Sequence, residues 1–298
     1  MDVETLQREL TAFDDAAEWK TLDARGHHWR YATVGHGAEP LMLIHGGGGD
    51  ARTMFRYATH LAPEFTVIVP TLPPSIDNTA DLTAGLAAVL DREGVETANV
   101  FGPSLGGWVT QAFAAHHPDR TGRCVISHCG LPQPDQVGRL KASLRFIRLL
   151  PFGLFRRMFL RGFRKSLETD VPDITDDEVS FWISLIEPVF DDGMTKDGVL
   201  AMMRFMIDFH GNSDLSASPL RREADRVVLV HHEHDDEVDE QARAEMRAFY
   251  PHAEAIVLPA YGHAAGLARA DLVIEAVRTF LRPPGPPSDD RTTRSDDQ

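Results

Sequence analysis

The sequence has few cysteines, no long apolar run and no excess of basic residues, and each shortage excludes a class of protein. Only Cys124 and Cys129 occur among 298 residues, too few for a disulfide framework. They flank the apolar stretch CVISHC, where both are expected to be small buried side chains. No charge-free apolar run approaches the roughly 20 residues of a membrane span. The sequence therefore predicts no disulfide scaffold and no stable membrane insertion.

The 45 acidic residues outnumber the 30 lysines and arginines, so the formal net charge is -15. Because nucleic-acid affinity rests largely on Lys and Arg that neutralise phosphates, the charge predicts no nucleic-acid partner. The first ten residues, MDVETLQREL, lack the basic start and apolar core of a signal peptide, which favours a cytoplasmic location. The apolar fraction of 43% is typical of a globular protein, and it leaves homo-oligomer formation open.

Apolar runs that alternate with helical patterns indicate an α/β fold. The runs are LMLIHGG, FTVIVPTL, TANVFGPS, RCVISHCG, RVVLVHHE and AEAIVLPA. Continuous apolar strands separated by helices predict a mostly parallel central sheet with helices on both faces. Before these runs, Leu6, Leu10 and Phe13 have the spacing of an amphipathic helix, and HHWRYATVG alternates as an edge strand does.

The strand pattern is interrupted once, between residues 131 and 216, where only helical periodicity and Pro and Gly breaks occur. We therefore predict that residues 131–216 form a helical cap inserted into an α/β core made of residues 1–130 and 217–282. Residues 283–298 are Pro-rich and then polar, with almost nothing apolar to bury, which predicts a disordered tail.

The predicted cap contains a basic segment followed by an acidic one. No acidic residue occurs between residues 141 and 165, where the basic residues are Lys141, Arg145, Arg148, Arg156, Arg157, Arg161, Arg164 and Lys165. The following stretch, 166–192, is acidic instead. Two helical layers with complementary faces are the favoured interpretation. A basic amphipathic helix that contacts a membrane surface, or that attracts an anionic acyl substrate, is the lesser alternative.

A single serine stands between glycines at the end of a predicted strand. Residues 100–107 are VFGPSLGG, so that Ser104 occupies the centre of a Gly-x-Ser-x-Gly pattern. An apolar strand precedes the pattern and helix-compatible residues follow it, which is the context of a strained strand-to-helix turn. Small residues two positions before and after the serine let neighbouring backbone pass close. This context makes Ser104 a candidate nucleophile.

A serine nucleophile needs a histidine base and an orienting carboxylate, and candidates for both follow later strands. His263 lies where AEAIVLPA gives way to the last predicted helix. Asp235, Asp236 and Glu237 follow RVVLV, and local chemistry does not distinguish them. For each acid taken singly, the alternative to an orienting role is that it belongs to a charged loop and caps the N-terminus of the helix that follows.

The glycine loop LIHGGGGD, residues 43–50, is a candidate oxyanion hole. The charge on a tetrahedral intermediate needs two backbone N–H donors. Gly47 is our choice for the first donor, with Gly46 or Gly48 as alternatives, and Leu105 supplies the second. We expect His45, at the start of the loop, to stabilise the loop.

The sequence predicts neither a cofactor nor a metal. No Lys-Ser/Thr pair follows the glycine loop, and no Gly-x-Gly-x-x-Gly spacing occurs. His231, His232 and His234 have no second ligand set, so hydrogen-bonded or solvent-facing histidines are the default interpretation. Trp108 is expected to pack in its helix. Most cap phenylalanines are expected in the cap core, with one or two lining a pocket: Phe146, Phe152, Phe155, Phe159 and Phe163.

Taken together, these features resemble the alpha/beta-hydrolase superfamily over residues 25–282. The segments HGGGG, GPSLGG, a helical insertion, HHEHDDEV and YGH occur in the order of that family. The resemblance implies an alpha/beta-hydrolase fold and a triad of Ser104, Asp235 and His263. It selects Asp235 because the family's Gly-x-x-Asp pattern falls on residues 232–235, where His232 replaces the glycine. Serine at the turn disfavours the haloalkane dehalogenases and epoxide hydrolases, which attack through a carboxylate.

The favoured function is a carboxylesterase-like serine hydrolase acting on a small-molecule ester with an apolar acyl or alcohol part. Where many family members have Asp-x-x-Gly-x-Gly-x-Ser, this chain has PTLPPSIDN. That turn, VFGPSLGGWVTQAF and ARAEMRAFYPHAEA are more similar to maspardin-like members, some of which are regarded as interaction proteins. The alternatives are therefore a maspardin-like binding protein with little turnover, or acyl transfer, C–C cleavage or a lyase step with the same triad.

Overall fold

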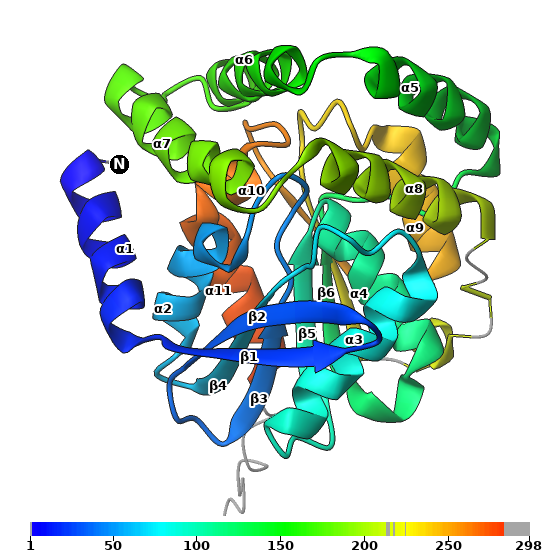
Figure 1. Cartoon of the computed structure of the whole chain (residues 1–298). Coiled ribbons are helices and arrows are strands. Elements are labelled where there is room, and N and C mark those ends of the chain that lie inside the picture. Colours follow the sequence, from blue (N-terminus) through cyan, green and yellow to red (C-terminus); the bar gives the residue numbers. More distant parts are fainter. Residues whose placement is uncertain (1, 213–214, 217, 224, 283–298) are drawn as a thin grey trace, which may run out of the picture.

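A sheet of eight strands forms the centre of the computed structural model, which describes residues 2–212, 215–216, 218–223 and 225–282 (Figure 1). The predicted tail, 283–298, lies outside the described residues. The strands are β1 (Glu18–Ala24), β2 (His27–Val34), β3 (Glu39–Leu43), β4 (Phe65–Thr71), β5 (Ala98–Pro103), β6 (Thr121–Ser127), β7 (Val227–His232) and β8 (Glu254–Leu258). Their order is β1-β2-β4-β3-β5-β6-β7-β8. β2 pairs antiparallel with β1 and β4, and the remaining pairs are parallel.

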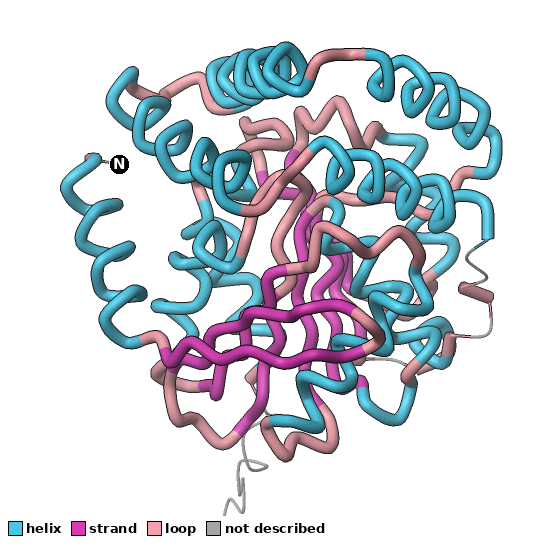
Figure 2. The backbone as a smooth tube through the Cα atoms, in the orientation of Figure 1, coloured by secondary structure: helices cyan, strands magenta, loops and turns pink. Residues whose placement is uncertain are grey.

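Helices cover both faces of the sheet (Figure 2). In the described part of the chain they are α1 (Val3–Ala16), α2 (Phe55–Leu61), α3 (Thr79–Arg92), α4 (Leu105–His116), α5 (Val137–Leu149), α6 (Phe152–Asp170), α7 (Asp176–Asp192), α8 (Lys196–Asn212), α9 (Glu240–Phe249), α10 (Ala265–Ala268) and α11 (Ala270–Leu281). α1, α2 and α11 contribute to the core on one face of the sheet, and α3, α4 and α9 to the core on the other. The predicted α/β fold with a mostly parallel sheet is confirmed.

The continuous apolar runs follow from burial of the sheet on both faces. In β5, Phe101 joins the core on the α2 and α11 side, whereas Val100 joins the core on the α3 and α4 side. In β7, Val228 and Leu229 divide in the same way. Because successive side chains of a strand point to opposite faces, both positions of each pair must be apolar.

The helices α5 to α8 lie between β6 and β7 in the chain and extend across the top of the molecule in Figure 1. Thr175 begins α7 with a capping box, in which its side chain and that of Glu178 each bond the other's backbone N–H. The basic α6 contacts the acidic α7 through Arg156, which pairs with Glu187 and Asp191. The boundaries predicted for the cap, 131–216, remain a prediction.

Two of the expectations from the sequence are wrong. HHWRYATVG is not an edge strand, because β1 lies outside it and was not recognised as a strand. Phe146 is not in the cap core, since 57% of its surface is exposed. Cys124 and Cys129 are free and buried, as expected. Within the described residues, no helix is both long and apolar enough to cross a bilayer.

Candidate active site

Ser104 sits in a strained turn between β5 and α4. Its backbone has φ 55° and ψ -124°, a conformation that non-glycine residues rarely adopt. The flanking glycines make the turn possible, because a Cβ on Gly102 would lie 2.3 Å from the Gly106 carbonyl oxygen. A Cβ on Gly106 would lie 2.3 Å from the carbonyl oxygen of Ile44. The turn therefore raises the serine side chain above the carboxyl end of the sheet.

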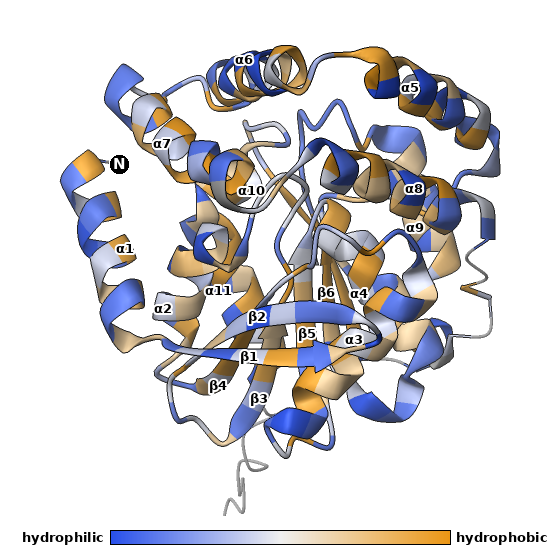
Figure 3. Ribbon diagram, in the orientation of Figure 1, coloured by the Kyte–Doolittle hydropathy of each residue, from blue (hydrophilic) through white to orange (hydrophobic). Residues whose placement is uncertain are grey.

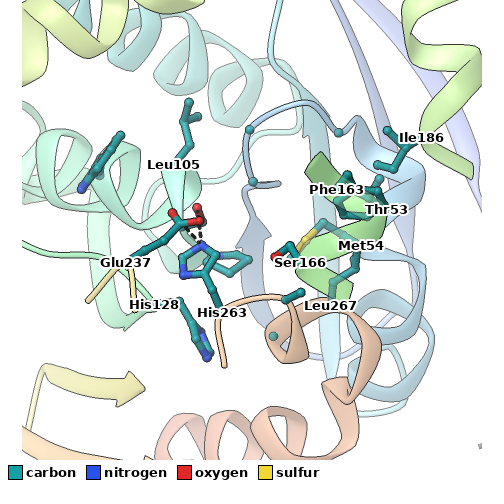
Figure 4. A pocket seen from close by; sticks show the side chains of 18 of the residues that line it. Thr53, Met54, Leu105, His128, Phe163, Ser166, Ile186, Glu237, His263 and Leu267 are labelled. Carbon is teal, nitrogen blue, oxygen red and sulfur yellow. Dashed lines mark hydrogen bonds and ion pairs between the residues drawn. The ribbon is translucent and has the colours of Figure 1, made fainter. Parts of the chain in front are cut away.

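The three residues that the resemblance selects from distant parts of the chain are hydrogen-bonded to one another. His263 Nε2 lies 2.9 Å from Ser104 Oγ, and His263 Nδ1 lies 3.0 Å from each carboxylate oxygen of Asp235. Asp236 is exposed and makes no hydrogen bond or ion pair with any residue that the structure describes. Glu237 approaches from the solvent side, with Oε2 3.6 Å from His263 Nε2 (Figure 4).

Asp235 lies in the loop after β7, where its carboxylate accepts hydrogen bonds from the loop backbone. Its Oδ1 accepts the backbone N–H groups of Glu237 and Val238, and only 2% of the residue is exposed. Burial raises the pKa of this carboxyl, but the hydrogen bond and charge of His263 and the two N–H donors outweigh burial and lower it. The carboxylate therefore stays ionised and can hold a proton on His263 Nδ1.

His263 is held between this carboxylate and the serine. Burial lowers the pKa of His263, but the hydrogen bond and charge of Asp235 outweigh burial. With a smaller contribution from Glu237, they raise the pKa above its ordinary value of 6.5. A proton held on Nδ1 leaves Nε2 free to accept the proton of Ser104.

The glycine loop after β3 passes beside Ser104 and the start of α4. A Cβ on Gly46 would lie 3.7 Å from Ser104 Cβ, and one on Gly47 3.7 Å from Leu105 Cδ1. Leu105 is the first residue of α4, so its N–H has no acceptor within the helix. Gly46 and Gly47 line the cavity above Ser104, whereas Gly48 lines a neighbouring, smaller one.

These groups open into a cavity of about 500 Å³. Its walls come from the sheet edge and from helices above it, and they include Tyr57, Trp108, Phe159, Phe163, Met202 and Met206. Among the described residues, Glu237 is the only acidic one in the lining, and no Lys or Arg contributes to it. Apolar side chains thus surround the reactive groups, with a single carboxylate at the rim.

The cavity contains residues that the sequence did not single out. His128, directly after β6, lines it and hydrogen-bonds through Nε2 to His232 Nδ1 over 2.6 Å. Burial lowers the pKa of His128 well below its ordinary range, and the neighbouring histidines lower it further, so it is neutral. Ser166 of α6 also lines the cavity and donates to Asp170. The only signal for His128 was its place at a strand end.

His45 has the surroundings that the sequence predicts, and Trp108 has them only in part. His45 bonds the Gly46 carbonyl through Nδ1 and accepts the Leu72 N–H through Nε2, so it stabilises the loop as expected. Trp108 packs on Phe209 at 5.5 Å between ring centroids but also lines the cavity.

The two histidines at the end of β7, His231 and His232, differ in their surroundings. His231 is buried and has no hydrogen-bond partner among the described residues. It is therefore neither hydrogen-bonded nor solvent-facing, contrary to the expectation from the sequence. His232 is also buried, but it is hydrogen-bonded to His128, as the default interpretation allowed. In the described ranges, no group of three or more His, Cys, Asp and Glu side chains is arranged to hold a metal ion.

Two of the known proteins that this chain resembles match it over part of their length. The dihydrolipoyllysine-residue acetyltransferase component of the acetoin cleaving system of Cupriavidus necator is 36% identical over 115 residues, which are 36% of this chain and 31% of that protein. A 2-hydroxy-6-oxononadienedioate/2-hydroxy-6-oxononatrienedioate hydrolase of Paraburkholderia phymatum is 34% identical over 156 residues, 48% of this chain and 53% of that protein. The chain thus spans between about a third and a half of the length of these relatives.

The fold and the family are supported over most of the chain. The crystal structure of a hydrolase from Pseudomonas aeruginosa has a TM-score of 0.71 at 19% identity, covering 89% of this chain and 99% of that one. At that identity the likeness shows the fold alone. Residues 41–276, which include the Ser104 turn and His263, match the model of the alpha/beta hydrolase family. The chain belongs to the alpha/beta hydrolase family.

Proposed function

We propose that this chain is a serine hydrolase that cleaves carboxylic esters whose acyl and alcohol parts are uncharged and largely apolar. The observation that carries the proposal is the continuous hydrogen-bond chain from Ser104 through His263 to Asp235, at the floor of an apolar cavity. A hydroxyl, a base and a buried carboxylate in this order are the parts that acyl transfer through serine requires.

In the first half-reaction, Ser104 Oγ attacks the acyl carbon while His263 Nε2 takes its proton. Asp235 keeps the other ring nitrogen protonated and stabilises the imidazolium. The N–H groups of Gly47 and Leu105 donate to the oxyanion. When the intermediate collapses, the C–O bond to the alcohol breaks and His263 returns the proton to the leaving oxygen. In the second half-reaction, His263 takes a proton from the water that attacks the acyl carbon. The C–O bond to Ser104 then breaks, His263 returns the proton to Ser104 Oγ, and the acid is released.

The lining of the cavity supports an uncharged substrate. A carboxylate buried there would meet aromatic and methionine side chains, the negative charge of Glu237 at the rim, and no Lys or Arg from the described residues. Burying a charge without a partner is costly. The relative from Paraburkholderia phymatum is named for dioates, and the two carboxylates of a dioate would lack a basic partner in this lining.

Two esters of equal length test this substrate preference. We expect p-nitrophenyl pentanoate to have a kcat/KM at least about 100-fold higher than p-nitrophenyl hydrogen succinate, because only the second places a carboxylate in the apolar cavity. The comparison is made from initial rates of p-nitrophenol release at one pH and ionic strength, with the rate without enzyme subtracted for each ester, because the free carboxylate of the hydrogen succinate also expels p-nitrophenol intramolecularly. The p-nitrophenyl methyl succinate diester, of similar shape but uncharged, is the control and should regain most of the rate. Equal rates for the pentanoate and the hydrogen succinate would contradict the assignment.

The protonation of His263 predicts the pH profile of this activity. Only the neutral imidazole can accept the proton of Ser104, and the pKa of His263 is raised above 6.5. The rate should therefore fall as the pH decreases through the raised pKa, and the acid limb of kcat/KM should have its midpoint above pH 6.5. An initial-rate profile from pH 5 to pH 9 in buffers of constant ionic strength measures it. A midpoint clearly below 6.5 would show that Asp235 does not act on the base.

A series of p-nitrophenyl esters from acetate to decanoate, measured beside labelling by a fluorophosphonate probe, tests the proposed function as a whole. Turnover of at least one ester together with labelling of Ser104 is expected. If Ser104 is labelled but no ester is cleaved, the chemistry is not simple ester hydrolysis, and acyl transfer, C–C cleavage or a lyase step takes its place. If neither occurs, a maspardin-like binding role replaces catalysis.

A further inference from the structure

The outer side of α5 and α6 carries charge that the proposed chemistry does not use. Between residues 137 and 167 there is no acidic residue, and nine residues are basic: Arg139, Lys141, Arg145, Arg148, Arg156, Arg157, Arg161, Arg164 and Lys165. Arg156 pairs with α7 and Arg164 with Glu168. The other seven are exposed and form no ion pair with any described residue. The sequence-based picture of two complementary layers thus accounts for only a small part of this charge.

The same two helices expose apolar side chains. Of the six large hydrophobic residues exposed in the described part of the chain, four lie here: Phe146 (57%), Leu149 (83%), Leu154 (42%) and Met158 (49%). Figure 3 shows apolar and charged residues interleaved along α5 and α6. No residue of α5 is buried, and Leu167 alone is buried in α6. We call the seven unpaired basic residues and these four apolar residues the α5–α6 surface.

Helix geometry places the α6 members of this surface on one side of that helix. In α6, Leu154, Met158, Arg161 and Lys165 follow one another at spacings of three or four residues, and such residues share a helix face. In α5, Arg145 and Leu149 have the same relation. The opposite side of α6 faces inward, where Phe159, Gly162, Phe163 and Ser166 line the cavity. α6 is thus a roof with the candidate active site beneath it and the α5–α6 surface above it.

We propose that the α5–α6 surface docks on an anionic lipid surface. Lys and Arg beside exposed Leu, Phe and Met are the combination with which interfacial helices bind lipid, since the cations contact headgroups and the apolar side chains enter the acyl boundary. The chain as a whole carries a net charge of -15, so the rest of the molecule is repelled by such a surface and the docked orientation is fixed. A soluble polyanion would match the charge but leave the four apolar side chains in water.

Docking in this orientation would place the roof of the cavity against the lipid. An apolar ester could then pass from the membrane into the cavity without crossing bulk water. The transfer of an ester from the membrane rests on the proposed function. The docking itself does not, because none of the eleven residues of the α5–α6 surface belongs to the candidate active site. The two can therefore fail separately.

The experiment measures sedimentation of the full chain with lipid vesicles, in the Ser104→Ala background so that hydrolysis cannot interfere. Vesicles of phosphatidylcholine alone are compared with vesicles containing 30% phosphatidylglycerol, at 50 mM and 500 mM salt. We expect binding to the anionic vesicles that weakens at high salt, and little binding to the neutral ones. Absence of binding to anionic vesicles at low salt would overturn the proposal.

Matched variants locate the binding surface. Arg145→Gln, Arg148→Gln, Arg157→Gln and Arg161→Gln combined should weaken partitioning at least about tenfold, because each basic residue near an anionic surface contributes to binding. The control combines Arg8→Gln, Arg30→Gln, Arg92→Gln and Arg222→Gln, four exposed arginines outside α5 and α6, for the same change of net charge. Equal loss in both variants would assign the binding to net charge and overturn the proposal.

A third variant separates lipid from other partners. Leu149→Ser, Leu154→Ser and Met158→Ser combined keep every charge and should also weaken vesicle binding about tenfold, since the loss of apolar contact with the acyl region is independent of charge. Binding equal to that of the parent would indicate a charge-only surface and exclude lipid docking. Sedimentation velocity without vesicles is the second measurement: self-association abolished by the Arg→Gln variant, with no vesicle binding, would assign the surface to a second copy of the chain.

Discussion

Replacing Ser104 by alanine is expected to lower kcat/KM for the best p-nitrophenyl ester by a factor of about 10⁴ to 10⁶, because the nucleophile is lost while the cavity and oxyanion donors remain. The residual rate reflects direct attack by water on an ester held in the cavity. The hydroxyl is hydrogen-bonded to His263 Nε2, and because His263 lines the cavity, water can replace the lost hydroxyl as a partner. The melting temperature should change little, and circular dichroism measures this.

Fluorophosphonate labelling separates Ser104 from the other serine in the cavity. Ser166 also lines the cavity, but its hydroxyl donates to Asp170 Oδ2 over 2.7 Å, and no histidine among the described residues is hydrogen-bonded to it. Labelling should therefore disappear in Ser104→Ala and persist in Ser166→Ala. Retained turnover in Ser104→Ala with label on another residue would place the nucleophile elsewhere.

The positions of the candidate catalytic residues could be predicted because each lies in the segment that follows a strand. Parallel strands bring their carboxyl ends to one edge of a sheet, so Ser104, Asp235 and His263 had to lie near one another once the strands were recognised. The choice between Asp235 and Asp236 could not be derived from local chemistry. It depends on the turn after β7, which buries the first side chain and exposes the second.

The hairpin of β1 and β2 was predicted only in part because its signals are weak. Its turn uses Arg25 at φ 55° and Gly26 at φ 78°, which is the backbone of a tight hairpin, but Arg-Gly is not one of the favoured Asn-Gly or Asp-Gly pairs. β1 is also half exposed and contains no fully buried residue, so it lacks a hydrophobic pattern. Its place at the sheet edge is set by pairing with β2.

The residues of the cavity wall were beyond sequence reasoning for a different reason. His128 and Ser166 line the cavity only because β6 lies beside β7 and because α6 crosses above the sheet edge. Neither relation is encoded locally in SHCG or in the phenylalanines of α6. The phenylalanines show the limit clearly: Phe146 and Phe163 are alike in the sequence, yet the first is exposed and the second faces the cavity.

Asp235→Asn should lower kcat/KM by about 10⁴-fold while the fold is kept, because an amide changes the tautomer of the base. The Asp235 carboxylate accepts a hydrogen bond from His263 Nδ1–H over 3.0 Å, which keeps the proton on Nδ1 and leaves Nε2 as the acceptor for Ser104. An asparagine amide that donates to Nδ1 would place the imidazole proton on Nε2, facing the serine. The variant should also move the acid limb of its residual activity to lower pH, since Asp235 raises the pKa of His263.

Asp236→Asn is the matched control, with the same chemical change one residue further along the chain. Asp236 is exposed and has no polar contact among the described residues, so its variant should keep kcat/KM within about twofold of the parent. The reverse result, a silent Asp235→Asn and an inactive Asp236→Asn, would require the loop after β7 to turn one residue later. The buried carboxylate with two N–H donors would then have a structural role alone, and the raised pKa of His263 would need another source, for which Glu237, 3.6 Å from Nε2, is the nearest charge.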